Sequence, residues 1–152
     1  MAKHIHIVWH SKTGNTAALV KALYDGISHS ETVNCRLIDA LNPSIEALTE
    51  ADFIVFATPE NFGYMSGGLK HFFDETYYEV EELQLALPYC AVISAGNDGT
   101  GAAREIHRIM TGYGFHKVVE DQIIKGTPSP NDLKAFTELG IALAEGLSLG
   151  IY

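Results

Sequence analysis

The sequence is poor in cysteine and has no long apolar run. Its two cysteines, Cys35 and Cys90, both lie inside strand-like segments, and they form no Cys-x-x-Cys pair. We therefore expect free, buried thiols rather than a disulfide, and no sulfur-based metal or redox chemistry. No apolar run approaches the roughly 20 residues that span a bilayer, and the first residues lack the apolar core and cleavage site of a signal peptide. These absences predict a cytoplasmic protein with no membrane partner.

Basic residues are also scarce, with 10 Lys and Arg against 19 Asp and Glu and a formal net charge of −9. Nucleic acids and anionic membranes select proteins with a basic surface, so we exclude both as partners. A basic protein surface, in contrast, would attract this chain. The 47% hydrophobic and 19% charged composition is typical of a folded globular protein. A length of 152 residues suits one domain, which we expect to cover residues 1–152.

Strand-like and helix-like patterns alternate along the chain. The apolar runs are short, rich in β-branched residues and mostly unalternating, and they cover residues 5–9, 32–38, 53–57, 89–95 and 115–124. Such runs predict parallel strands that are covered on both faces. Apolar residues at i, i+3 and i+4 predict helices over 19–27, 69–80, 102–113 and 133–147, and Pro43 predicts a short helix over 44–50.

This alternation predicts a doubly wound α/β fold. In such sheets, ligands bind beyond the carboxyl ends of the strands, at the point where the strand order reverses. The loops after the first, third and fourth strands, which cover residues 10–15, 58–65 and 96–100, are therefore the candidate binding region.

The first of these loops begins HSKTGNT and consists mainly of small polar residues. Two interpretations stay open. Either Thr13 or Asn15 simply caps the following helix, or the run cradles a phosphate at the helix N-terminus, with Gly14 closing the turn. We favour the phosphate, because the run is too long for a single cap. The Walker A order is absent, which argues against triphosphate hydrolysis, and the G-x-G-x-x-G dinucleotide motif is absent as well.

The second loop, ATPENFGYMSGG, places Phe62, Tyr64 and Met65 next to Gly63. A flat aromatic ligand or a partner surface would use such a cluster. Alternatively, these side chains fold back onto the core. The third loop, ISAGNDGTGA, has glycines where a ligand would press on the backbone, although its Asn-Asp pair could equally form a turn.

The first two loops resemble motifs of a known family. Ser11-Lys12-Thr13-Gly14-Asn15-Thr16 is similar to the T/S-x-T-G-x-T phosphate loop of flavodoxins. TPENFGYMSGGLKHFFDET resembles the loop and helix of the flavodoxin-like NAD(P)H-dependent FMN and quinone reductases, and the matching residues are Pro59, Gly63, Met65, Ser66, Gly68, Lys70, Phe73 and Asp74. The resemblance implies a flavodoxin-like, five-stranded parallel sheet with the strand order 2-1-3-4-5.

The resemblance also implies a non-covalently bound FMN, with NADPH or NADH as the electron donor. The residues that would hold its phosphate are Ser11, Lys12, Thr13, Gly14, Asn15 and Thr16. The residues that would flank its isoalloxazine ring are Pro59, Glu60, Asn61, Phe62, Gly63 and Tyr64. The residues that would line the pyrimidine side of the ring are Ser94, Ala95, Gly96, Asn97, Asp98 and Gly99.

The expected function is that of an FMN-dependent oxidoreductase, which passes electrons from NAD(P)H to a quinone, a flavin or a similar acceptor. Two alternatives are a flavodoxin-type electron carrier between protein partners and a non-redox domain that binds a phosphate ligand. Partners are then a small-molecule redox substrate or a redox protein, and a homodimer is a further expectation.

A flavin supplies the redox chemistry itself, so no acid or base side chain is obligatory and we assign no catalytic residue. We also assign no metal site. His4 and His6 lie on one side of the first strand but have no third ligand in view, and we interpret them as exposed residues at the strand's end.

Overall fold

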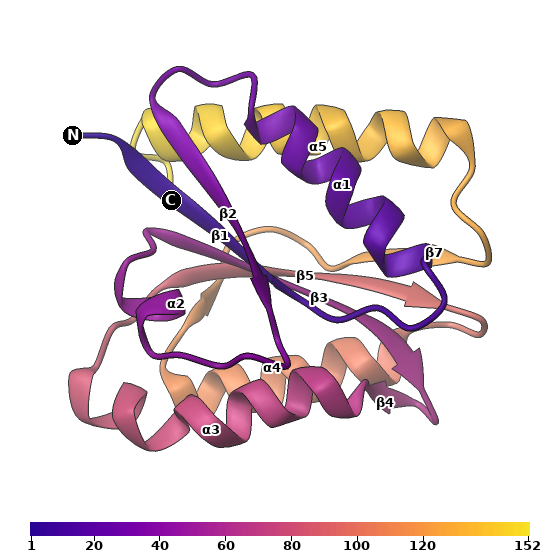
Figure 1. The fold of residues 1–152 in the computed structure, drawn as a ribbon, viewed down its shortest axis with the longest axis horizontal. Helices are drawn as coiled ribbons and strands as arrows, with labels where there is room; N and C mark the ends of the chain where they lie inside the picture. Colours follow the sequence, from indigo (N-terminus) through magenta and orange to yellow (C-terminus); the bar gives the residue numbers. More distant parts are fainter.

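The structure is a computed structural model that describes residues 1–152, and it contains one sheet between two layers of helices (Figure 1). Its elements, in chain order, are β1 (Lys3–Trp9), α1 (Asn15–Ile27), β2 (Val33–Asp39), α2 (Glu46–Thr49), β3 (Phe53–Asn61), β4 (Tyr64–Met65), α3 (Gly67–Leu83), β5 (Pro88–Ala95), α4 (Thr100–Tyr113), β6 (His116–Lys117), β7 (Gln122–Lys125) and α5 (Pro130–Ser148).

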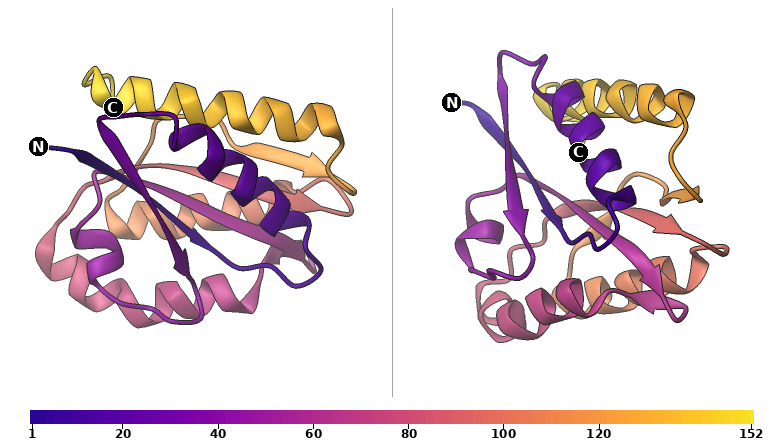
Figure 2. Two further views of the ribbon diagram at one scale, coloured as in Figure 1. Left: turned by 45° about the horizontal axis from the view of Figure 1, so that its top comes forward. Right: turned by 45° about the vertical axis from the view of Figure 1, so that its right-hand side comes forward.

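Helices α1 and α5 cover one face of the sheet, and α2, α3 and α4 cover the other (Figures 1 and 2). The strand order is β2-β1-β3-β5-β6, and these strands are parallel to one another. This arrangement confirms the predicted doubly wound α/β fold. None of the helices is both long enough and apolar enough to cross a membrane.

Cover on both faces explains why the strand sequences do not alternate between apolar and polar residues. In β3, Phe53 and Val55 pack with α1 and α5, while Ile54 and Phe56 pack into the core on the opposite face. All four side chains are fully buried. Residues in this part of β3 therefore have apolar side chains, whichever way they point.

The predicted count of five strands is wrong, because the sheet has seven strands. The order reads β2-β1-β3-β5-β6 instead of 2-1-3-4-5, because the short strand β4 is inserted in the chain between β3 and β5. The fifth predicted strand, over 115–124, is divided into β6 and β7, which both pair with β5. Between these two pairings β5 advances from Tyr89 to Val92, whereas the partner segment advances from Lys117 to Gln122. The longer segment includes two acidic residues and leaves the sheet before it returns as β7.

A second difference concerns residues 58–65, which were expected to form a loop. Strand β3 runs on to Asn61, and the chain turns back immediately as β4, with Asn61 paired to Tyr64. The result is a tight hairpin at the carboxyl edge of the sheet. The predicted helices correspond to α1, α3, α4 and α5, while α2 is shorter than its predicted range of 44–50.

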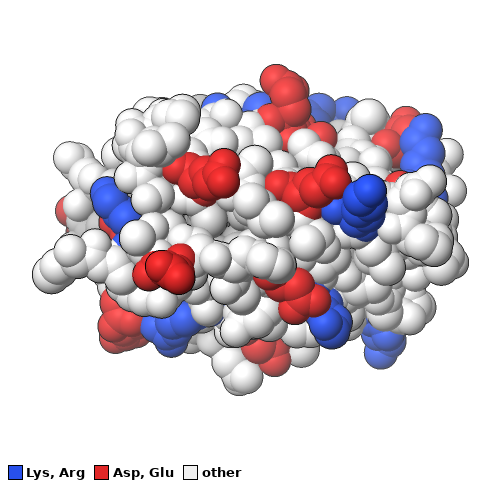
Figure 3. Space-filling view, turned by 90° about the horizontal axis from the view of Figure 1, so that it is seen from above, with Lys and Arg blue, Asp and Glu red and all other residues white.

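The surface over α1 and α5 carries both signs of charge. In the view from above, acidic side chains are scattered, with basic ones among them, and no large patch of one sign forms on this face (Figure 3). The net charge of −9 is therefore not concentrated there.

Candidate functional site

The carboxyl ends of β1, β3 and β5 bring the three predicted loops to one edge of the sheet, on the right in Figure 1. The loop after β1 leads into α1, the β3–β4 hairpin leads into α3, and the loop after β5 leads into α4. Segments that are far apart in the sequence thus form one candidate site.

The N-terminus of α1 has hydrogen-bond donors without partners. Its N-cap is Gly14, at φ 105°, a conformation that L side chains rarely adopt, and no side chain bonds there as a cap. Neither Thr13 nor Asn15 is the cap. The amide of Ala17 donates to Ser11 Oγ over 3.2 Å, but the amides of residues 12–16 donate to no protein acceptor. Free amides at a helix N-terminus suit an anion.

Thr16 and Ser94 join the first loop region to the third. Their hydroxyl oxygens lie 2.6 Å apart in a buried hydrogen bond between the first turn of α1 and β5. Both residues were predicted to touch the cofactor directly. In the structure their hydroxyl groups bond each other, so they fix the position of α1 above the sheet.

The β3–β4 hairpin turns on Phe62 and Gly63, at φ 54° and 68°. Positive φ at both central residues is typical of a type I′ turn, which normally takes Asn-Gly rather than a large aromatic. Phe62 is nevertheless fully exposed, whereas Met65 is buried in the core and Tyr64 is half-buried. The alternative of folding back onto the core therefore applies to Met65 but not to Phe62.

A hydrogen-bond network anchors the base of this hairpin. The Ser66 hydroxyl is the N-cap of α3, accepting from the amide of Leu69 over 3.3 Å, and it lies 2.9 Å from Nδ1 of His10. The Ser66 amide donates to Thr58 Oγ1 over 2.9 Å. The His10 ring also packs on Gly68, where a Cβ atom would lie 2.6 Å from it. His10 thus links the start of the first loop to the hairpin.

The N-terminus of α4 is closed by carboxylates. Its N-cap is Gly99, in the left-handed conformation. Glu60 of the hairpin accepts from the amides of Gly99 and Ala102 over 3.1 and 3.2 Å. Asp98 accepts from the amide and the hydroxyl of Thr100 over 3.0 and 2.9 Å, and these bonds lower the pKa of the Asp98 carboxyl.

A hollow of about 460 Å³ lies between the hairpin and the loop before α4. Its lining residues are Glu60, Phe62, Gly63, Gly96, Asn97, Asp98, Thr100, Gly101 and Arg104. Six of these were predicted from the sequence. Thr100 lies inside the predicted loop 96–100 but, like Gly101 and Arg104, was not predicted to contact the cofactor. The signal for these three residues was their position in the first turns of a helix that starts directly at the third loop.

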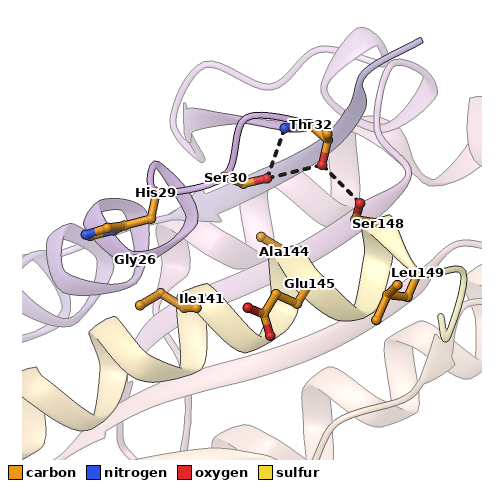
Figure 4. A pocket seen from close by; sticks show the side chains of 9 residues that line it. All are labelled: Gly26, His29, Ser30, Thr32, Ile141, Ala144, Glu145, Ser148 and Leu149. Atoms are coloured by element: carbon orange, nitrogen blue, oxygen red, sulfur yellow. Dashed lines mark hydrogen bonds between the residues drawn. The ribbon is translucent and has the colours of Figure 1, made fainter.

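Another hollow, of about 420 Å³, lies away from this edge, between the end of α1 and the end of α5 (Figure 4). The hydroxyl groups that line it are already hydrogen-bonded within the protein. Thr32 Oγ1 lies 3.0 Å from Ser148 Oγ, and the Thr32 amide donates to Ser30 Oγ over 3.2 Å. This hollow therefore offers few free polar groups to a ligand.

The remaining titratable groups point to no second reactive centre. Burial raises the pKa of the Cys35 and Cys90 thiols to about 12, so neither is a reactive thiolate near neutral pH. No cluster of His, Cys, Asp and Glu is arranged to hold a metal ion. His6, expected to be exposed, is instead buried, with Nδ1 2.8 Å from the carbonyl of Ala47, and burial lowers its pKa.

Known proteins match between about half and three quarters of this chain. The family model described as NADPH-dependent FMN reductase matches residues 10–127. A flavodoxin from Aquifex aeolicus is 26% identical, over 72% of this chain and 60% of that protein. An NAD(P)H dehydrogenase (quinone) from Archaeoglobus fulgidus is 31% identical, over 47% of this chain and 50% of that protein. The matches thus span about half to three fifths of those curated relatives.

Among solved structures, a flavodoxin from the domain Archaea superposes with a TM-score of 0.77. It is 26% identical, and the match covers 95% of this chain and 99% of that one.

Proposed function

Because the chain belongs to the NADPH-dependent FMN reductase family, a flavodoxin-like FMN-binding family, we propose that it is an FMN-dependent oxidoreductase. It takes electrons from NAD(P)H and passes them to a quinone, a flavin or a similar small acceptor. The observation that carries this proposal is the N-terminus of α1, where the amides of residues 12–16 have no acceptor within the protein.

The donors at α1 fit the phosphate of FMN. A dianion would gain several main-chain hydrogen bonds and the favourable end of the helix dipole. Lys12 is exposed beside these amides and adds a positive charge, while Ser11 and Thr13 add hydroxyl groups. A phosphate dianion only accepts hydrogen bonds, so it matches this set of donors. A site lined by carboxylates would repel the phosphate.

The hairpin and the loop before α4 fit a flat ring. Phe62 offers an exposed aromatic face at the edge of the 460 Å³ hollow, and the residues opposite, 96–98, are exposed and include Gly96. When bound, FMN supplies the hydride chemistry. The chain's part is to bind the phosphate, to orient the ring and to leave one ring face open to the nicotinamide. Glu60 and Asp98 place negative charge near that ring.

The experiment is an anaerobic reaction of the FMN-loaded protein with NADPH and, separately, with NADH. We expect the visible absorbance of the flavin to bleach rapidly and completely with at least one of them. Slow or absent bleaching with both, in a protein that is yellow and folded, would contradict the reductase proposal.

A flavodoxin-type carrier is the second candidate, favoured by the phosphate loop at residues 11–16 and by the 26% identity to the Aquifex flavodoxin. Such a carrier accepts electrons from a redox protein and reacts poorly with nicotinamides. Reduction by a redox protein combined with no bleaching by NADPH or NADH would favour it. A purified protein that stays colourless with excess FMN would contradict both candidates.

A further inference from the structure

The carboxylate of Glu60 bonds a helix to which it does not belong. Glu60 is the second-last residue of β3, at the base of the hairpin. Its Oε1 accepts from the Gly99 amide over 3.1 Å, and its Oε2 accepts from the Ala102 amide over 3.2 Å. These two amides belong to the N-cap and the third residue of α4, about 40 positions further along the chain.

In a capping box, the same two amides donate to side chains of the helix itself. The amide of the third residue donates to the N-cap side chain, and the N-cap amide donates to the side chain of the third residue. Here those residues are Gly99 and Ala102, and neither has a polar side chain. One carboxylate from another segment therefore replaces both partners of the box. Its negative charge also lies at the end of the helix where the dipole favours an anion.

A second contact holds the tip of the hairpin against the same helix. A Cβ atom on Gly101 would lie only 2.1 Å from the carbonyl oxygen of Gly63. The hairpin is therefore seated on α4 at its base through Glu60 and at its turn through Gly63. Phe62 lies between these points and lines the hollow together with residues 96–98.

We propose that Glu60 is a positioning residue, whose carboxylate acts as a built-in anion on α4. It locks the hairpin to the loop before α4, so that the two sides of the ring site keep one spacing. It also occupies the anion-binding end of α4, so that a phosphate binds at α1 alone. This inference depends on the proposed function, because the ring that the locked site would hold is that of FMN.

The experiment compares Glu60→Ala and Glu60→Gln with the wild-type protein. The alanine variant loses both acceptors, whereas the glutamine variant keeps one acceptor oxygen and loses the charge. Glu138→Gln is the matched control, since it removes one charge from an exposed position on α5, on the opposite face of the sheet. If Glu60→Ala fails to fold, the glutamine variant carries the test.

The first measurement is amide hydrogen exchange in the protein without FMN. We expect Gly99 and Ala102 to exchange about tenfold faster or more in Glu60→Ala, because each amide loses a bond to a charged acceptor. Glu60→Gln should fall between that variant and wild type, and Glu138→Gln should match wild type. Unchanged exchange at Gly99 and Ala102 in Glu60→Ala would overturn the proposal.

The second measurement compares the affinity for FMN with that for inorganic phosphate. We expect Glu60→Ala to weaken FMN binding about tenfold, while phosphate binding at α1 stays unchanged and phosphate now also perturbs the α4 amides. Equal weakening of both ligands, or no weakening of FMN, would overturn it. If wild type itself fails to bind FMN, the proposed function fails, whereas the exchange result still tests the link between Glu60 and α4.

Discussion

Helices α1 and α4 begin at the same edge of the sheet, and each has a glycine N-cap in the left-handed conformation. The backbone amides at their N-termini nevertheless differ in whether they are hydrogen-bonded within the protein. At α4, three amides are already bonded to the carboxylates of Glu60 and Asp98. At α1, one amide is bonded to Ser11, and the amides of residues 12–16 are free.

The difference shows that a helix dipole alone does not define an anion site. Both helices have a dipole of the same sense, but α1 has five successive free amides for a ligand, whereas among residues 99–102 of α4 only the Gly101 amide has no acceptor. An incoming phosphate at α4 would have to displace two carboxylates that carry the same charge. The phosphate of FMN is therefore expected at α1, and the flat ring is expected in the hollow beside α4.

The largest expected effect comes from Gly101→Ala, in the first turn of α4. The new Cβ would lie 2.1 Å from a backbone oxygen, which no side-chain rotation can relieve. We expect the free energy of unfolding, measured with urea, to fall by about 3 kcal/mol. Gly67→Ala, at the start of α3, is the control, because nothing lies within 4 Å of the new atom. If both variants are equally stable, the hairpin is not seated on α4 as described.

The second prediction concerns the strained turn of the β3–β4 hairpin. Phe62→Asn creates the sequence preferred in a type I′ turn and loses no buried surface, so we expect a gain of about 1 kcal/mol in unfolding free energy. FMN binding, measured by quenching of flavin fluorescence, should weaken because the aromatic face is lost. Gln84→Gly relieves a similar φ of 50° at the end of α3 and should stabilise the protein without changing FMN affinity. Unchanged FMN affinity in the Phe62 variant would exclude Phe62 from the ring site.

The third prediction concerns the N-terminus of α1. Lys12→Gln removes an exposed charge beside the free amides, and we expect FMN affinity to fall by about 1 kcal/mol or less, with a weaker dependence on salt. Lys21→Gln, further along on α1 and paired with Asp25 at 2.8 Å, should leave FMN affinity unchanged. Equal effects of the two substitutions would indicate a general charge effect rather than a contact with the phosphate.

The smallest effect is expected for Asp98→Asn at the closed terminus. The amide and hydroxyl of Thr100 hold the pKa of Asp98 below its usual value of 3.8, so the folded state favours the carboxylate. This contribution is present above a pH of about 3.8 and is lost as the pH falls through the lowered pKa. We expect a small, constant stability difference from wild type near neutral pH that disappears in acid. A difference that grows in acid would contradict this assignment.

Local sequence patterns were sufficient for the layers and for the loops that meet at the site. Unalternating apolar runs are a direct consequence of burial on both faces, and they located the central strands. The division of the last strand into β6 and β7 depends on how the segment aligns with β5. The sequence of the segment alone does not show that alignment. The hairpin was also missed, because Phe62 is an unusual residue for such a turn.

Contacts between distant segments were beyond the reach of sequence patterns. Glu60 was predicted to flank the isoalloxazine ring, but no local pattern indicates that its carboxylate bonds α4, about 40 residues away. His6 was expected to be exposed, but α2 covers it, and the position of that short helix depends on tertiary packing. Each of these contacts joins residues whose proximity only the folded sheet creates.

The most direct test of the account compares FMN with riboflavin, which lacks the phosphate, in a titration of the protein followed by backbone amide NMR shifts. The account predicts that the difference between the two ligands is concentrated at the amides of residues 12–16, with little change at Gly99 and Ala102. A difference concentrated at Gly99 and Ala102, with residues 12–16 unaffected, would contradict it.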